Sequence, residues 1–341
     1  MRRATMRDVA AAAGVSFKTV SRVVNDEPGV SGPLVDRVHA AVAALGYRHN
    51  LAARSLRHSE QRTASMAVLL QDLSNSFSAE LMRAIDDVAR ERDLVVMATS
   101  LDEEEEREHG LVANLIKRRV DGLIMMPASR DHAYLQREVS AGFHVVLIDR
   151  PPINVDVDFV GVDNVGGARQ ATNHLLQQGH RRIALITDEV RVATARQRLD
   201  GYRTALAQAG VEYDGALVRA ARSREAAAEA VRELLASANP PTAVFSARNV
   251  ITEGTALALR RAGLSDRIAM VGFDDLPWAD LLSPGITVIK QDALAVGRLA
   301  AELLLSRMGG STDPPRHQML PVQLIPRGSG EIQALRSSHQ A

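Results

Sequence analysis

The sequence predicts a small all-α head joined to a larger α/β body that holds two doubly wound parallel sheets. Three observations predict this fold class. Residues 5–45 carry three short stretches in which apolar residues recur with helical spacing, and glycines close two of them. From residue 66 onward, short apolar runs alternate with amphipathic stretches, which is the pattern of βαβ units. At 341 residues the chain is also too long for one ordinary core, so we expect more than one domain.

Charge separates the head from the body. Residues 1–62 hold ten Lys and Arg against five Asp and Glu, although the whole chain has a formal net charge of zero. A basic head on a mildly acidic body is typical of a phosphate-binding module attached to a second function. The chain has no cysteine, which excludes disulfides and thiolate metal sites. We identify no signal peptide and no apolar run near the roughly 20 residues of a membrane helix, so we expect a cytoplasmic protein.

Two short helices that meet at a glycine turn form the first part of the head. Thr5 is expected to cap the first helix, Gly14 to allow the tight turn and Ser16 to cap the second helix. The second helix buries its valines and leaves its other side chains outward, namely Phe17, Lys18, Thr19, Ser21, Arg22 and Asn25. Arg and Lys pair with guanine edges in the major groove, and Ser, Thr and Asn suit phosphate oxygens. This is the layout of a helix-turn-helix DNA-binding module.

A third helix is expected over residues 33–45, ending at Gly46. Its predicted inward residues are Leu34, Val38, Ala41 or Val42, and Leu45. The segment from Asn50 to Leu56 favours helix but has too few residues to be stable alone.

The head resembles the lactose-repressor (LacI/GalR) family of bacterial transcription regulators. The resemblance is carried by Val15–Asn25, Val30-Ser31, Ala44–Tyr47 and Asn50–Leu56. It implies a hinge helix that folds only when two copies meet on the operator, with Leu56 wedged into the minor groove and Asn50 and Ala53 against that groove. It also implies phosphate contacts from Ser16, Thr19, Ser21, Asn25 and Ser31. One departure is His49, where the family usually has proline, and this loosens the start of the hinge.

The body alternates strands and helices in two series. In the first, strands at 66–70, 94–98, 123–126 and 145–148 alternate with helices near 78–92, 104–118 and 131–141. In the second, strands at 183–186, 243–245 and 268–271 accompany helices near 165–178, 195–209, 224–237 and 250–262. Glu103 to Glu106 are expected to form the solvated first turn of a helix.

The body also resembles the periplasmic-binding-protein-like core of the same family, through segments such as Val162-Asp163-Asn164, Gly179–Ala184 and Val271–Asp275. This resemblance implies three crossings between two subdomains. The expected domains are a DNA-binding domain at 1–48, a hinge and linker at 49–62, an N-subdomain at 63–162 plus 292–321, a C-subdomain at 163–291 plus 322–330, and a polar tail at 331–341.

A cleft between two such subdomains is the expected ligand pocket, because ligands bind outside the carboxyl ends of the strands. Family placement and side-chain chemistry select nine residues: Leu73, Asn75, Phe77, Asp149, Arg196, Arg248, Asp274, Trp278 and Gln291. Carboxylates can accept sugar hydroxyls, and Phe77 or Trp278 could supply a flat apolar face. For each residue alone, a helix cap or an interdomain bridge is the competing interpretation; as a set they favour a small sugar or sugar-derived effector.

Arg248 stands where the family usually has asparagine. A second guanidinium beside Arg196 would favour a carboxylate or phosphate, which gives the hypothesis of a sugar acid or sugar phosphate. If Arg248 instead turns outward or pairs with a carboxylate, a neutral sugar fits as well.

The sequence therefore predicts a homodimeric, ligand-responsive transcription regulator, a repressor that reads a near-palindromic operator through Phe17, Lys18 and Arg22. No nucleophile–base arrangement, nucleotide-binding motif or metal-ligand spacing stands out, so we expect no catalysis, cofactor or metal. Two other classes compete. A solute-binding protein for sugar uptake would explain the body but neither the basic head nor the missing signal peptide. An enzyme on a doubly wound fold would need a catalytic constellation.

Overall fold

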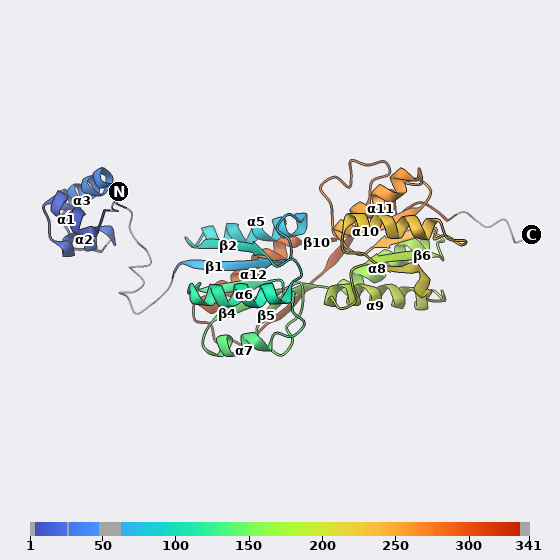
Figure 1. Cartoon of the computed structure of the whole chain (residues 1–341), viewed down its shortest axis with the longest axis horizontal. Helices are drawn as coiled ribbons and strands as arrows, with labels where there is room; N and C mark the ends of the chain where they lie inside the picture. The colour runs from blue at the N-terminus through green and yellow to red at the C-terminus, as the bar shows by residue number, and fades with distance from the viewer. Residues whose placement is uncertain (1–3, 26, 48–62, 335–341) are drawn as a thin grey trace, which may run out of the picture. The chain divides into compact units, whose positions relative to one another are not determined.

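The computed structural model describes residues 4–25, 27–47 and 63–334 (Figure 1). The chain divides into one unit of residues 1–63 and a second unit of residues 64–341. The predicted fold class is confirmed, because the first unit contains packed helices and the second contains two sheets whose strands are almost all parallel. The predicted hinge residues Asn50, Ala53 and Leu56 lie outside the described residues, as do the rest of 48–62 and the tail from 335.

The head has three helices: α1 (Met6–Ala13), α2 (Phe17–Val24) and α3 (Gly32–Leu45). Thr5 and Asp8 cap α1 reciprocally, since the Thr5 N–H donates to the Asp8 carboxylate at 2.8 Å and the Asp8 N–H donates to Thr5 Oγ1 at 3.3 Å. Gly14 ends the helix with a φ of 61°, and Ser16 caps α2 by accepting from the Thr19 N–H at 3.0 Å. The predicted caps and turn are thus confirmed.

The core of the head consists of Val9, Ala13, Val20, Val23, Val38 and Ala41. Arg37 ties α3 to the turn, because its Nη2 donates to the Ala13 carbonyl at 2.5 Å. The prediction that Leu45 points inward is wrong, since its side chain is 39% exposed. Gly46 turns the chain with a φ of 58°, and Tyr47 packs against the core at the end of the helix instead.

The first sheet of the body is fully parallel. Its strand order is β11 (His317–Leu320), β5 (Asp158–Val162), β4 (His144–Ile148), β3 (Gly122–Met125), β1 (Ser65–Leu70) and β2 (Val95–Ser100). Alternate side chains pack on opposite faces. One face meets α5 (Ser76–Arg90) and α12 (Ala293–Met308), and the other meets α6 (Glu105–Lys117) and α7 (Ala133–Ser140).

The second sheet repeats this architecture with one antiparallel pair. Its order is β12 (Val322–Ile325), β10 (Thr287–Gln291), β9 (Ala269–Phe273), β8 (Ala243–Ser246), β6 (Ile183–Thr187) and β7 (Val218–Ala220), with β12 antiparallel to β10. One face is covered by α8 (Asn164–Gln177) and α9 (Ala193–Gln208), and the other by α10 (Arg224–Leu235) and α11 (Asn249–Arg261).

The chain runs between the two sheets three times. It passes to the second sheet after Val162, returns after Gln291, and passes again between Leu320 and Val322. The loops that follow the parallel strands of the two sheets therefore contribute to one shared cavity. None of the described helices has the length and apolar character that a membrane crossing requires.

Candidate effector cavity and DNA-reading helix

A cavity of about 60 Å³ lies between the two sheets and is built from both of them. From the first sheet, the loops after β1, β2, β3 and β4 supply Gln71, Asn75, Glu103, Met126, Asp149 and Arg150. From the second sheet, the loops after β6, β8 and β9, the start of α9 and the end of β10 supply Asp188, Arg198, Arg248, Asn249, Asp274 and Gln291.

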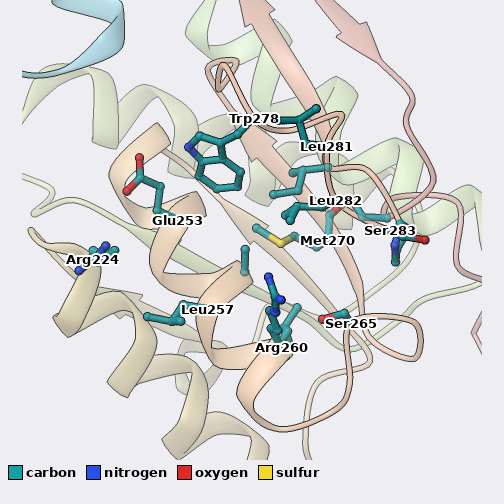
Figure 2. Close-up of a pocket in the computed structure, with 15 residues that line it drawn as sticks. Arg224, Glu253, Leu257, Arg260, Ser265, Met270, Trp278, Leu281, Leu282 and Ser283 are labelled. Carbon is teal, nitrogen blue, oxygen red and sulfur yellow. Dashed lines mark hydrogen bonds between the residues drawn. The ribbon is translucent and has the colours of Figure 1, made fainter.

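Six of the nine predicted effector residues line this cavity: Asn75, Phe77, Asp149, Arg248, Asp274 and Gln291. The other three lie elsewhere. Leu73 packs against the core of the first sheet. Arg196 lines a neighbouring cavity of about 220 Å³. Trp278 lines a third cavity of about 630 Å³ beside α11, together with Leu282 and Met270 (Figure 2).

Asp149 is a buried carboxyl group in the cavity between the sheets. It directly follows β4 with a φ of 64°, and its N–H donates to the Val160 carbonyl at 3.0 Å. Its carboxylate has no hydrogen bond among the described residues, and the nearest cation is Arg150 Nε at 3.9 Å. Burial raises the pKa of Asp149, although Arg150 and Arg198 oppose this shift. Asp149 therefore presents acceptor oxygens to the cavity.

Asp274 occupies the equivalent place in the second sheet. It follows β9 with a φ of 71°, and its N–H donates to the Ile289 carbonyl at 2.8 Å. Gln291 Nε2 donates to one oxygen of its carboxylate, Oδ1. Asp149 and Asp274 thus present acceptors from the two sheets to one cavity.

Arg198 is a second cation whose charge acts on both carboxylates, and sequence reasoning missed it. Its Nε donates to Asn164 Oδ1 at 2.8 Å, its Nη1 donates to the Ala247 carbonyl at 2.7 Å, and its guanidinium lies 3.7 Å from the Phe273 ring centroid. Burial lowers the pKa of Arg198, while Asp274 and Asp149 work against that shift. The side chain is only 5% exposed, so neutral groups hold a buried positive charge at the cavity wall.

The sequence did contain a signal for Arg198. On a helix, residues 196 and 198 point about 200° apart, so only one of the two arginines can face inward. Ala195, Leu199 and Tyr202 are buried, and their spacing places Arg198 on the buried face of α9.

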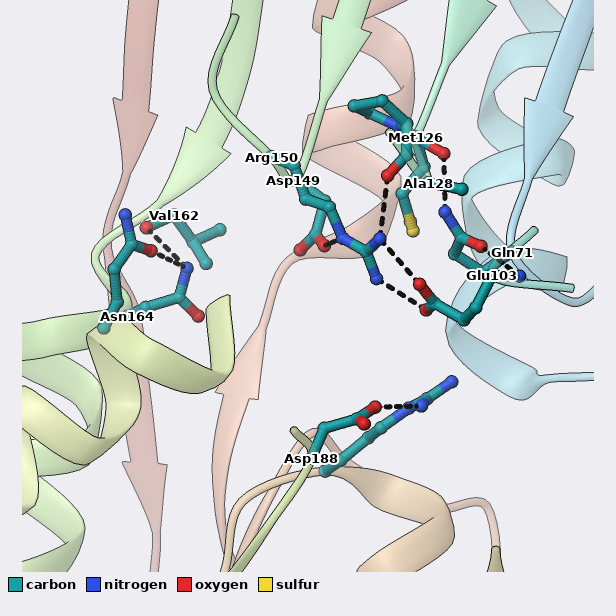
Figure 3. Close-up of polar contacts among 12 residues, drawn as sticks. Gln71, Glu103, Met126, Ala128, Asp149, Arg150, Val162, Asn164 and Asp188 are labelled. Carbon is teal, nitrogen blue, oxygen red and sulfur yellow. Dashed lines mark hydrogen bonds and ion pairs between the residues drawn. The ribbon is translucent and has the colours of Figure 1, made fainter. Parts of the chain in front are cut away.

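The other two arginines of the cavity are paired with acids (Figure 3). Arg150 makes two bonds to Glu103, at 2.8 and 2.6 Å. Arg248 Nη1 donates to Asp188 Oδ2 at 2.8 Å. Burial alone would raise the pKa of Glu103, but the paired Arg150 lowers it. Glu103 is therefore a largely buried partner of an arginine, and the expectation that it lies in a solvated helical turn is wrong for this residue. Glu105 and Glu106 do lie exposed in the first turn of α6.

The Arg248–Asp188 pair bears on the hypothesis of an anionic effector. That hypothesis placed Arg248 beside Arg196, but Arg196 lines the neighbouring cavity and the Arg248 charge is balanced by Asp188. Because Arg248 pairs with a carboxylate, a neutral sugar fits the cavity as well as an anionic one does.

Most of the predicted DNA-binding residues of the head lie on α2 and at its ends, and Ser31 precedes α3. Phe17 is 39% exposed, and Lys18 is exposed beside it. Lys18, Arg22 and Asn25 share one face by their spacing, opposite the buried Val20 and Val23.

The remaining polar side chains of this region are partly occupied. Thr19 Oγ1 lies 2.8 Å from Ser16 Oγ, and Asn25 donates to Ser21 Oγ at 3.3 Å. Arg22 Nε lies 3.9 Å from Glu27. Ser31 is the residue before α3, and its side chain makes no capping bond there.

Two family models match the chain. Residues 5–50 match the model of bacterial regulatory proteins of the lacI family, and residues 172–330 match the periplasmic binding protein-like domain. The chain is 33% identical over 333 residues to the ribose operon repressor of Escherichia coli (strain K12), covering 96% of this chain and 99% of that one.

Two solved structures are similar over nearly the whole chain. One is the transcriptional regulator CelR–cellobiose complex, with a TM-score of 0.72, 33% identity, and coverage of 96% of this chain and 100% of that one. The other is the lac repressor dimer bound to operator and the anti-inducer ONPF, with a TM-score of 0.83, 27% identity, and coverage of 96% and 99%. The helix-turn-helix head, the two-sheet core and these matches together place the chain in the lacI family of bacterial regulatory proteins.

Proposed function

We propose that this protein is a DNA-binding transcriptional repressor whose affinity for its operator is set by a neutral, polyhydroxylated sugar in the cavity between the two sheets. The observation that carries the proposal is the buried set of Asp149, Asp274 and Arg198, which two sheets bring together in a chain with a helix-turn-helix head.

The charges of the cavity favour a neutral sugar. Arg150 and Arg248 are neutralised by Glu103 and Asp188, so neither offers an unbalanced charge to an anion. Asp149 keeps acceptor oxygens for sugar hydroxyl groups, and Asp274 keeps the oxygen that Gln291 does not bind. Burying an anionic ligand against these two carboxylates would add like-charge repulsion. The cellobiose bound to the related CelR regulator supports this class of ligand.

The related lac repressor, which binds its operator as a dimer, supports operator binding by two copies of this chain. Two copies would each place α2 in the major groove, with Lys18, Arg22 and Phe17 toward base edges. Ser16, Thr19, Ser21, Asn25 and Ser31 would set the register on phosphates. Asn50, Ala53 and Leu56 would lie against the minor groove between the two half-sites. The protein would act in the cytoplasm, where operator DNA is present, and would catalyse no reaction.

Sugar binding would reach the DNA through the movement of the subdomains. The cavity draws residues from both sheets, so a sugar favours one arrangement of the two sheets over others. A shift of the first sheet in one copy against its partner then separates the hinges and weakens operator binding.

A thermal-shift screen of the full chain tests the effector class. Neutral sugars, sugar acids and sugar phosphates would be compared at one ionic strength, and a sugar at 100 times its Kd stabilises by about 2.7 kcal/mol. We expect neutral sugars to raise the melting temperature of wild type and of Asp200→Asn, an exposed control on α9, but not that of Asp149→Asn. Stabilisation by acids or phosphates alone would contradict the neutral-sugar assignment.

A solute-binding protein shares the core, so DNA binding decides between the two functions. Operator sequences selected from a random DNA library should bind the full chain at low salt. Selection that yields no sequence while sugar still binds would favour the solute-binding function.

A further inference from the structure

The neighbouring cavity of about 220 Å³ has a chemistry of its own. It draws residues from 128–132 and 150–153 of the first sheet's subdomain, and from 191–196 at the start of α9. It shares only Arg150 and Val192 with the sugar cavity.

Positive charge dominates this cavity. Arg130, Arg150, Arg191 and Arg196 line it, and no carboxylate does. Arg150 and Arg191 are balanced by Glu103 and Glu189. Arg130 and Arg196 make no hydrogen bond or ion pair with any described residue, although the charge of Glu189 also acts on Arg130. Because Glu189 already pairs with Arg191, the four arginines keep an excess of positive charge.

Asp131 lies between two residues of this cavity, Arg130 and His132, but its carboxylate already accepts hydrogen bonds from other groups. The Ala133 N–H donates to it at 2.9 Å, and Asn154 Nδ2 donates at 2.8 Å. It therefore does not neutralise the arginines of the cavity by direct pairing.

The start of α9 adds backbone donors. Val192 precedes the helix and supplies no side-chain cap, and the first turn holds no acidic residue. The first N–H groups of a helix have no acceptor within it, and the helix dipole favours negative charge at this end. Val192 and Ala193 line the cavity, so this positive helix end opens onto it.

His132 adds a buried donor. Its Nδ1 accepts from the Ile153 N–H at 2.9 Å, which places the proton of the neutral ring on Nε2. Burial lowers the pKa of His132, which keeps the ring neutral. The side chain is 1% exposed. The Ser129 backbone interacts with the ring, but Nε2 has no partner at hydrogen-bonding geometry among the described residues. An unbound buried donor is costly, and an acceptor oxygen in the cavity would relieve that cost.

We infer that this cavity binds the phosphate group of a small ligand, as a second effector site separate from the sugar cavity. Arginines, a helix N-terminus and a neutral histidine donor all complement phosphate oxygens. Since residues 128–132 and 191–196 belong to opposite sides of the core, a bound phosphate would bridge them and bias their arrangement. Phosphate binding at this site is independent of which sugar the first cavity binds.

Isothermal titration of the full chain with inorganic phosphate tests this site, with chloride at equal ionic strength as the reference. We expect saturable binding by wild type and at least a tenfold loss of affinity in Arg196→Gln and in Arg130→Gln. Both side chains are exposed, so unchanged melting temperatures would verify that the variants fold. Methyl phosphate in place of phosphate reveals whether the site takes a phosphate ester or only the free ion.

Two control variants locate the effect. Arg169→Gln removes an exposed arginine of α8, and Arg22→Gln removes a cation of the DNA-binding head; neither should change phosphate binding. Asp149→Asn should abolish sugar binding and keep phosphate binding, which separates the two sites. Phosphate that does not saturate, or that binds Arg196→Gln and Arg130→Gln as tightly as Arg169→Gln, would overturn the inference.

Discussion

Asn75 and Asn249 exchange hydrogen bonds between the two sheets of the core. Asn75 Nδ2 donates to Asn249 Oδ1 at 3.0 Å, and Asn249 Nδ2 donates to Asn75 Oδ1 at 2.7 Å. Asn75 lies in the loop after β1, and Asn249 begins α11 after β8. The pair therefore joins the two walls of the sugar cavity at its edge and stabilises the arrangement in which Asp149, Asp274 and Arg198 surround one space.

Replacing Asn249 by alanine should weaken sugar binding by removing both hydrogen bonds of the asparagine pair. Each of the two bonds contributes about 1 kcal/mol, so we expect up to about a 30-fold loss of affinity. Calorimetric titration with the sugar found by the thermal-shift screen measures this. Asn173→Ala, a variant elsewhere on α8, serves as the control. Unchanged affinity in Asn249→Ala would mean that the asparagine pair does not hold the cavity together.

Removing Arg248 should destabilise the fold by leaving the Asp188 charge without its arginine, although the Glu189 N–H still donates to Asp188 Oδ1 at 2.8 Å. The Asp188 side chain is 7% exposed, and an unsatisfied buried group costs about 1–3 kcal/mol. Urea unfolding should therefore show Arg248→Gln below wild type, and the double variant Arg248→Gln, Asp188→Asn should recover most of the loss. Arg232→Gln, which breaks an exposed pair with Glu229, should have little effect. A double variant no more stable than the single one would refute this role of the pair.

Asp149→Asn should stabilise the protein at neutral pH while abolishing sugar binding. Burial raises the pKa of Asp149 in the folded state, so the folded protein holds this proton more tightly than the unfolded chain. Wild-type stability is therefore lost as the pH rises through the raised pKa. Below the ordinary Asp pKa of about 3.9, both states are protonated and this loss is absent.

Melting temperatures of wild type and Asp149→Asn measured from pH 4 to pH 8 check the sign. The advantage of the variant should grow as the pH rises and shrink toward pH 4. An advantage that is constant over this range would show that the charge of Asp149 is not the cause.

Variants of α2 should separate base reading from phosphate contact. Lys18→Ala and Arg22→Ala should each weaken binding to the selected operator by about 1–3 kcal/mol and relax the preference at the bases they read. Thr19→Ala should weaken operator and random DNA alike. Competition gel shifts at fixed salt measure the ratio, with His39→Ala on α3 as the control. An equal loss on operator and random DNA for Arg22→Ala would assign that residue to phosphate.

Most of the fold could be predicted because local patterns dictate it. The caps at Thr5 and Ser16 and the turn at Gly14 depend on residues four or fewer positions away. The central strands are continuous apolar runs, since both faces of a parallel sheet are covered. Leu45 was misplaced because the chain reversal at Gly46, which no periodicity encodes, decides what packs at the end of α3.

Some strands, most of them at or near the edges of the two sheets, have only a weak strand pattern in the sequence. The three-residue β7 and the strands β11 and β12 lack long apolar runs, and β5 contains Gly161 and begins with a buried Asp158. Asp158 is tolerated there because Arg307 of α12 pairs with it. Such a pairing joins positions 149 residues apart and is not visible in a local pattern.

The candidate site could be predicted where a residue directly follows a strand. Asp149 and Asp274 follow β4 and β9, and Gln291 ends β10. Residues whose direction depends on helix rotation or distant partners could not be placed in this way. Arg196 and Arg198 differ by the rotation of α9, and Glu103 is held by Arg150, 47 residues away.

Fluorescence anisotropy of labelled operator DNA tests the central claim most directly. The full chain would be titrated at fixed salt, with and without the neutral sugar that stabilises it. The proposed function predicts that the sugar weakens operator binding by wild type at least tenfold and leaves binding by Asp149→Asn unchanged. An operator affinity that the sugar does not alter, or that it alters equally in Asp149→Asn, would contradict a sugar-controlled repressor that reads its effector through this cavity.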